Sequence, residues 1–397
     1  MLAMPGRGER SRGWVAWINN AEVRAVLYQV LTAAAIVALV WFFASNAAAN
    51  MAERGMSAGF DFLGVSAGFG ISFTLIPYQE GDSYFRVFLV GITNTLLVAV
   101  IAIVAASVLG LTVGLARLSD NWLVRTLARS YVELLRNTPL LLQIIAWFFG
   151  VFNLLPRPRE SLEWWGAFAL NNRGLYLPAP VPEPGFGLVL ATFAAAVVGA
   201  VGLARWAKRR QDRTGERFPA IPVGLAGIVV LPALVHTALG APLGWEIPQL
   251  SGFNFQGGMS VPPSFCALVV ALAVYTSCFI AEIVRSGIQS VGRGQREAAS
   301  SLNLKPSTTM RLVVLPQALR VVIPPLISQY LNITKNSSLA IAVGFPDLVS
   351  VWMNTSLNQS GRAISIVAMT MAFYCVASLS VSYVLNLYNR RIMLKER

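Results

Sequence analysis

Long apolar runs are the feature that most restricts what this chain can fold into. A helix needs roughly 20 mostly apolar residues to cross a hydrocarbon core about 30 Å thick. Stretches of suitable composition follow one another along the chain at residues 25–44, 87–115, 139–155, 185–203, 221–239, 264–283, 321–343 and 363–388. Only 12% of the residues are charged, against roughly a quarter in soluble domains. The sequence therefore predicts an all-α integral membrane protein with about eight transmembrane helices.

The basic residues indicate how these helices are oriented. The chain carries 31 Lys and Arg residues, of which 24 fall on one side of the predicted helices, six on the other, and Lys335 within a helix. Cytoplasmic segments of membrane proteins are enriched in Lys and Arg, so both termini are predicted to be cytoplasmic. The formal charge of +13 is divided among short loops, which excludes the continuous basic face that nucleic-acid binding requires.

Catalytic and cofactor chemistry finds little support in the sequence. Cys266, Cys278 and Cys375 fall within predicted helices, and the only histidine, His236, has no neighbours at metal-ligand spacing. There is no Gly-rich loop that ends in Lys followed by Ser or Thr, so the chain shows no means of binding ATP by itself. We expect no catalytic residue, no metal and no cofactor in this chain.

The N-terminal part allows two interpretations. A basic start, an apolar stretch and three alanines at residues 47–49 resemble a cleavable signal peptide. Signal peptides usually have an apolar region of about 7 to 15 residues, and the longer stretch here favours an uncleaved membrane anchor. The outer loop that follows, residues 45–85, is rich in Gly, Ser and acidic residues and contains Phe60, Phe62, Phe69 and Phe73. We expect this loop to lie along the membrane surface.

Composition divides the chain into four parts. They are residues 1–86 with the first helix and the outer loop, 87–155 with the first part of a helical core, 156–262, and 263–397 with the second part of the core. The third part has Pro-rich ends and two helices of Ala, Gly and Val joined by a basic turn, which is typical of lipid-facing padding. We interpret it as an insertion, and its removal with the first helix leaves a five-helix core.

The loop at residues 285–316 is the most informative segment on the cytoplasmic side. Its residues predict a short helix with small side chains at Ala298 and Ala299, a turn, and a second helix that Pro306 opens at its first position. Small side chains allow the groove of another protein to approach the helix backbone closely. The alternative is an ordinary basic cytoplasmic loop, because such loops are the rule in membrane proteins.

This loop resembles the EAA loop of type I ABC importer permeases. The resemblance rests on Gly294, Gln295, Glu297, Ala298, Ala299, Leu302, Asn303, Leu304 and Pro306, with Leu315 and Pro316 further on. In that family the loop forms a coupling helix that sits in a cleft of the cytoplasmic ATPase. Asn303 stands where the family usually has Gly, and Asn tolerates the left-handed conformation at a helix end. Lys305 replaces a common Ser, which can shift the start of the second helix.

Other stretches resemble permeases for polar amino acids. They are residues 133–141, 279–288 and 335–348, and Thr138 in the first of them is expected to cap the following helix. The layout with an extra first helix and a two-helix insertion is similar to a permease of the bacterial general L-amino-acid importers. That resemblance implies an inner-membrane heterodimer with a related second permease, a pair of ATPase subunits and a periplasmic amino-acid-binding protein.

Polar residues within the predicted helices suggest a translocation path or gate. The candidates are Glu282, Asn332, Lys335, Asn336, Ser337 and Ser338. An ionisable group at membrane depth costs about 2.5 to 3.5 kcal/mol unless it finds a partner or water. Glu282 lies beside Arg285, which favours an ion pair over substrate contact, whereas Lys335 fits either role. Pro324 and Pro325 are predicted to break the inner half of the seventh helix.

Two functional hypotheses follow. In the first, the chain is a passive permease for polar L-amino acids, and a separate ATPase drives it through the loop around Glu297. In the second, the chain is a self-sufficient transporter in which Glu282 takes up and releases a coupling proton. A membrane enzyme is poorly supported, because the sequence offers no nucleophile with an adjacent base.

Overall fold

The computed structural model describes residues 21–53 and 59–392. Its α-helices are α2 Ala21–Glu53, α3 Tyr84–Ala116, α4 Trp122–Arg136, α5 Leu140–Gly150, α6 Phe186–Thr214, α7 Ala220–Ala238, α8 Pro263–Gln289, α9 Arg293–Ser301, α10 Pro306–Thr309, α11 Leu315–Asn336, α12 Leu357–Ser360 and α13 Ala363–Ile392. Within these ranges seven helices are long and apolar enough to cross a membrane, or eight if α4 and α5 are one bent span. This confirms the predicted all-α membrane fold. The predicted cytoplasmic location of the two chain ends concerns residues outside the described ranges.

Shorter helical segments complete the chain. The 3-10 helices are η1 Asp61–Gly64, η2 Phe152–Leu154, η3 Pro158–Glu160 and η5 Ser337–Val343, and the π-helices are η4 Met310–Val314 and η6 Leu348–Ser356. The last two long helices of the chain, α11 and α13, are joined through η5, η6 and the short helix α12.

The core is built around the close approach of α3 and α8. Small residues recur at every fourth position of α3, at Ala102, Ala106, Gly110 and Gly114, and such spacing lets two membrane helices come together. A Cβ atom at Gly110 would lie 2.6 Å from the Cβ atom of Ile280, so only glycine fits there. Helices α5 and α11 and the 3-10 helix η5 pack around the same pair.

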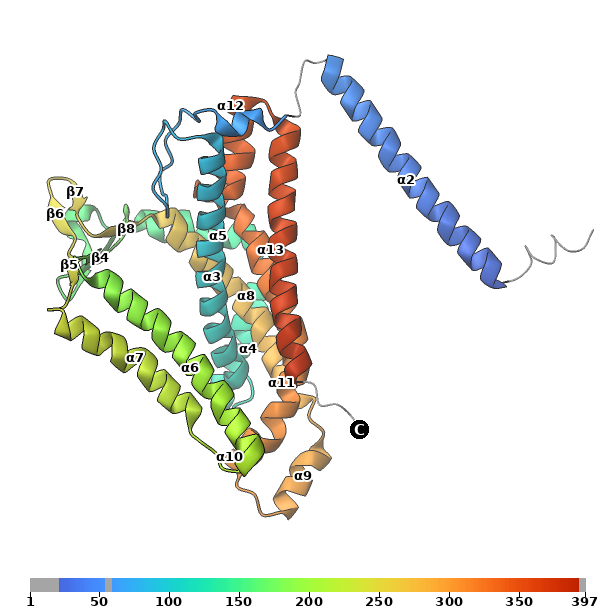
Figure 1. The fold of residues 1–397 in the computed structure, drawn as a ribbon, viewed down its shortest axis with the longest axis vertical. Coiled ribbons are helices and arrows are strands. Elements are labelled where there is room, and N and C mark those ends of the chain that lie inside the picture. Colours follow the sequence, from blue (N-terminus) through green and yellow to red (C-terminus); the bar gives the residue numbers. More distant parts are fainter. Residues whose placement is uncertain (1–20, 54–58, 393–397) are drawn as a thin grey trace, which may run out of the picture.

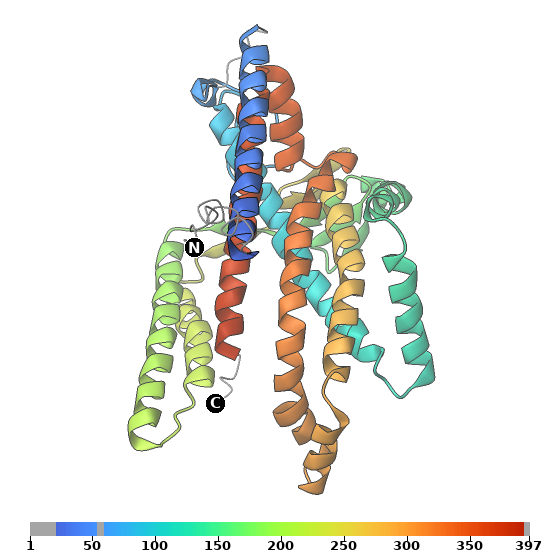
Figure 2. The same ribbon diagram turned by 90° about the vertical axis from the view of Figure 1, so that its right-hand side faces the viewer.

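Helices α2, α6 and α7 stand apart from this core (Figures 1 and 2). The apolar window of α2 has no buried residue, and those of α6 and α7 are 11% and 6% buried, against 61% for α8. Helices α6 and α7 pack against each other where Gly224 meets Ala200. Outside the charged residues 205–213 at the end of α6, most of their remaining surface is apolar and exposed, as expected for helices that face lipid.

The predicted third span is a broken helix. Helices α4 and α5 meet at 101°, and α5 is only about 16 Å long at 1.5 Å per residue. Thr138 does not cap α5 as expected, because its hydroxyl donates instead to the carbonyl of Leu134 at 2.9 Å, and Pro139 precedes the helix without a side-chain cap. The buried amide of Gln143 donates to the carbonyls of Leu135 and Thr138, and these bonds brace the bend.

The predicted break at Pro324 and Pro325 is wrong. Helix α11 runs through both prolines without interruption, because a proline φ near −65° is itself helical and both prolines are exposed. The irregular backbone lies at the two ends of α11 instead, in the π-helix η4 and in the 3-10 helix η5.

The outer loop packs against the helices of the core, which the sequence did not predict. Phe62 is 6% exposed, and its ring stacks 5.9 Å from that of Trp352. The ring of Phe73 lies 5.6 Å from that of Phe345. Residues 59–83 therefore fold over the ends of α3 and α12 (Figure 1) and belong to the core.

Short β-strands precede α6 and follow α7 in the sequence, and the sequence pattern gave no sign of them. They are β1 Leu162–Trp164, β2 Phe168–Asn171, β3 Gly174–Leu177, β4 Ala179–Pro182, β5 Leu243–Glu246, β6 Gln249–Ser251, β7 Asn254–Gln256 and β8 Met259–Val261. Antiparallel pairing gives a four-stranded sheet in the order β1-β2-β3-β8 and two ribbons, β4-β5 and β6-β7. The strands connect segments that are distant in sequence, since Leu175 pairs with Val261.

Candidate functional site

The predicted coupling residues lie on α9 and in the turn that follows it. Helix α9 projects beyond the ends of the membrane helices (Figure 1). Gly294, Gln295, Glu297 and Ala298 are exposed, Leu302 is 74% exposed, and in α9 only Ala299 is buried. Most of the surface of α9, together with the side chain of Leu302 just after its end, is therefore free of contacts within the described part of the chain.

Two contacts hold α9 against the membrane helices. The guanidinium of Arg296 donates to the carbonyl of Ile288, near the end of α8, at 3.0 Å. The amide of Gln317 on α11 donates to the side-chain oxygen of Gln295 at 3.4 Å. A displacement of α9 would therefore act on both α8 and α11.

The turn after α9 has the conformation that the sequence suggested. Asn303 has a φ of +53°, and the amide of Leu304 donates to the carbonyl of Ala299 at 3.2 Å. This is the hydrogen bonding of a helix that ends in a left-handed residue. Lys305 caps α10 only through its backbone, and Pro306 is the first residue of that helix, which confirms the predicted helix, turn and helix.

A substitution at Asn303 tests this turn. Valine strongly disfavours a positive φ, so Asn303→Val is expected to destabilise the turn by about 1–2 kcal/mol. The measurement is amide hydrogen exchange at Leu304 in the purified protein, which is expected to become roughly tenfold faster. Asn303→Gly is the matched control and should keep the amide protected, whereas equal protection in the valine variant would contradict the assigned role of the turn.

The predicted path residues at the end of α11 and the start of η5 occupy different environments. Asn332 and Lys335 are exposed and Asn336 is half-buried, and their spacing puts them on one side of the helix. Ser337 is fully buried, and its hydroxyl donates to the carbonyl of Thr334 at 2.8 Å. The hydroxyl of Ser338 likewise donates to Lys335, at 2.7 Å, so both serines satisfy the local backbone.

Glu282 belongs to a separate cluster. Its carboxylate forms ion pairs with Arg117 at the end of α3 and with Arg285 one turn further along α8. Of the ion pairs within the described part of the chain, none joins Glu282 to Lys335. The structure therefore does not bring the two predicted ionisable residues together, and Glu282 makes the pairing with Arg285 that its sequence position suggested.

A buried polar contact joins the first half of α3 to the loop before it and to the start of η6, and the sequence did not predict it. The side-chain amide of Asn94 donates to the carbonyls of Phe73 and Pro346, at 2.9 and 2.8 Å. The hydroxyl of Thr95 accepts the amide of Leu348 at 3.0 Å. These bonds tie the outer loop and the start of η6 to α3. The signal was the polar run Thr93, Asn94 and Thr95 in the first half of an otherwise apolar stretch.

Asp347 lies next to this contact and is fully buried. One carboxylate oxygen accepts the amide of Ser350 at 2.8 Å and caps η6. The other oxygen has no hydrogen-bond partner within the described residues. Nothing in these sites resembles a metal centre, because no group of three His, Cys, Asp or Glu residues in the described ranges is placed to hold an ion.

Comparisons with known proteins point in one direction. The family described as "Binding-protein-dependent transport system inner membrane component" matches residues 106–394. The chain is 51% identical to the putative amino-acid ABC transporter permease protein YhdX of Escherichia coli, over 95% of this chain and 96% of that one. It is 48% identical to the general L-amino acid transport system permease protein AapQ of Rhizobium johnstonii, over 95% and 94% of the two chains. It is 39% identical to the glutamate/glutamine/aspartate/asparagine transport system permease protein BztB of Rhodobacter capsulatus, over 96% of each.

Proposed function

Because this chain belongs to the family of binding-protein-dependent transport system inner membrane components, we propose that it is a permease subunit of an ATP-driven importer of polar L-amino acids. Three relatives that align over nearly the whole chain carry amino-acid permease names. The chain forms a multi-pass channel subunit in the inner membrane and performs no chemistry itself. A separate ATPase supplies the energy, and a binding protein supplies the substrate.

The observation that carries the proposal is the exposure of α9. A helix with a small exposed residue at Ala298, fixed to α8 and α11 by Arg296 and Gln317, is suited to transmit a movement of a docked ATPase to the core. The excess of basic residues beside α9 supports a cytoplasmic location for this helix. We assign both chain termini to the cytoplasmic side as well.

The translocation path follows α11 in this proposal. Asn332 and Lys335 are exposed on a helix that otherwise packs against α8 and α13. A polar surface at membrane depth requires water or a polar partner. We assign this surface to the contact with a second, related permease, so that the path runs between the two subunits. Residues 87–155 and 263–397 form the core in this assignment, and residues 156–262 form an insertion.

The proton-coupled alternative is not favoured. Glu282 already pairs with two guanidinium groups, which is the arrangement of a structural ion cluster and not of an isolated proton carrier. The family match likewise supports a transporter that depends on a binding protein.

The energy source distinguishes the two functions. We expect proteoliposomes that contain this chain, its second permease, the ATPase and the binding protein to accumulate labelled amino acid only when ATP is supplied on the ATPase side. A protonophore is expected to leave that uptake unchanged. Uptake without ATP that collapses with the protonophore would refute the proposal.

A further inference from the structure

The strands of residues 162–182 and 243–261 lie at one end of the membrane helices. The first set immediately precedes α6, and the second lies between the end of α7 and the start of α8. Three membrane-spanning segments therefore begin or end beside these strands. This places them at the level of the lipid head groups, whichever way the chain is oriented.

The strands expose aromatic side chains at this level. Trp165 is 91% exposed, Phe253 is 76% exposed and Trp245 is 61% exposed. Trp165 and Gly166 form the turn between β1 and β2, and Trp165 has a φ of +53°. A bulky residue with positive φ is rare and strained, so the turn holds a tryptophan outward at a cost in backbone energy. Tryptophan is enriched at membrane interfaces.

Three arginines line a pocket of about 360 Å³ beside these aromatic residues. Arg157, Arg159 and Arg173 share it with a single acidic residue, Glu160. The guanidinium of Arg159 lies 4.9 Å from the ring centre of Phe253. Within the described part of the chain none of the three arginines forms an ion pair. They are also half of the six basic residues on that side of the membrane.

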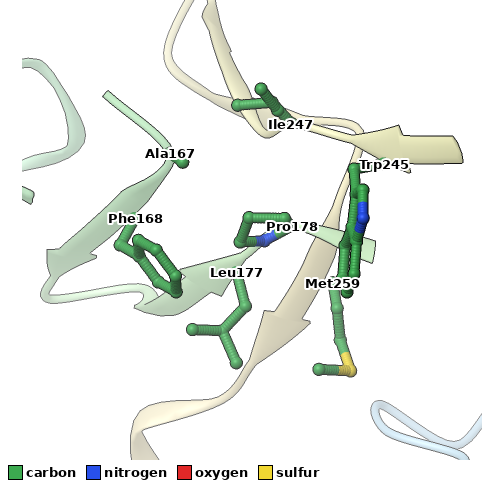
Figure 3. A pocket seen from close by; sticks show the side chains of 7 residues that line it. All are labelled: Ala167, Phe168, Leu177, Pro178, Trp245, Ile247 and Met259. Carbon is green, nitrogen blue, oxygen red and sulfur yellow. The ribbon is translucent and has the colours of Figure 1, made fainter. Parts of the chain in front are cut away.

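Apolar pockets adjoin the sheet. A pocket of about 590 Å³ lies between Phe168 on one side and Trp245 and Met259 on the other (Figure 3). A second, of about 510 Å³, lies between the sheet and helices α3 and α8, and it shares Leu177 and Met259 with the first. All the side chains that line the first pocket are apolar.

We infer that the Arg157, Arg159 and Arg173 pocket binds the phosphate of a membrane phospholipid, whose acyl chains lie against the apolar pockets of the sheet. Guanidinium groups bind phosphate through paired hydrogen bonds. Phospholipid is the phosphate-bearing molecule that surrounds this level of the protein. The strained Trp165 turn enters the same leaflet and fixes the strands at its surface. The inference rests on the proposed function only in that the chain spans a membrane.

Lipid retained by the purified protein tests the phosphate site. The full chain with its partner subunits is purified in mild detergent, and bound phosphatidylglycerol is quantified by mass spectrometry. The triple variant Arg157→Gln, Arg159→Gln, Arg173→Gln is expected to retain about tenfold less lipid than the wild type. The triple Arg→Lys variant is expected to regain part of it, because the charge is restored but the paired hydrogen bonds of the guanidinium groups are not. Glu160→Gln is the matched control in the same pocket and should retain as much lipid or more.

A second measurement locates Trp165. The difference between the fluorescence spectra of the wild type and of Trp165→Phe gives the emission of Trp165. In bilayers of lipid brominated near the head group, this emission is expected to be quenched. Unchanged lipid retention in the triple Gln variant would overturn the inference. Emission from Trp165 that brominated lipid does not quench would also overturn it. If the triple Gln variant keeps its lipid but no longer assembles with its partner subunits, the surface belongs to a protein partner and the inference is wrong. None of these readouts requires transport, so failure here is separate from failure of the proposed function.

Discussion

The Glu297→Lys substitution is expected to abolish amino-acid uptake and to release the ATPase. Glu297 is the only acidic residue of α9, and it is exposed. The change reverses the charge at the centre of the proposed docking surface, and like-charge contacts at interfaces cost several kcal/mol. We expect ATPase binding to weaken by about a hundredfold or more, as measured by pull-down alongside uptake of labelled amino acid in cells.

The control for this substitution is Asp212→Lys. Asp212 is exposed near the end of α6, on the same side of the membrane as α9, and its reversal changes the net charge by the same amount. Uptake and ATPase binding should both stay close to the wild-type level in that variant. A Glu297→Lys protein that still binds the ATPase and transports normally would show that α9 is an ordinary cytoplasmic loop.

The Gly110→Leu substitution is expected to prevent the core from assembling. A Cβ atom at Gly110 would lie 2.6 Å from the Cβ and Cγ2 atoms of Ile280 and 3.0 Å from the carbonyl oxygen of Ser277. Helices α3 and α8 would have to separate along the contact around which the core is built. Overpacking usually costs about 1–3 kcal/mol, and the larger leucine side chain adds to that. We expect little or no monodisperse protein by size-exclusion chromatography.

Gly199→Leu is the matched control for this effect. It lies in α6, and nothing lies within 4 Å of the position that its Cβ atom would take. Its yield and melting temperature should match those of the wild type, because a leucine there faces lipid. If Gly110→Leu also melts at the wild-type temperature, the close approach of α3 and α8 is not what holds the core together.

Much of the helical architecture could be predicted from the sequence because the bilayer imposes length and composition on a spanning helix. The predicted runs 87–115 and 264–283 lie within α3 and α8. The turn at Asn303 was predictable for a local reason, since Asn at a helix end is a recognised alternative to Gly. Pro306 marked the start of α10 in the same way.

The features that were missed depend on contacts between distant residues. The strand pairing of Leu175 with Val261 joins residues on either side of two membrane helices, and no local pattern encodes it. The packing of Phe62 and Phe73 into the core was not predicted, because an aromatic residue that packs into a core looks the same in sequence as one that lies in a membrane interface. The continuity of α11 through Pro324 and Pro325 likewise depends on which face of the helix is packed.

Cross-linking at Ala298 tests the central claim most directly. Ala298 is exposed on α9, and Ala298→Cys is introduced into a chain whose three native cysteines have been replaced, with Asp212→Cys as the control. We expect a short thiol cross-linker to join position 298, and not position 212, to the ATPase subunit in the assembled complex. We also expect the yield of this product to change when ATP is bound. An intact complex in which position 298 never reacts with the ATPase would contradict the account.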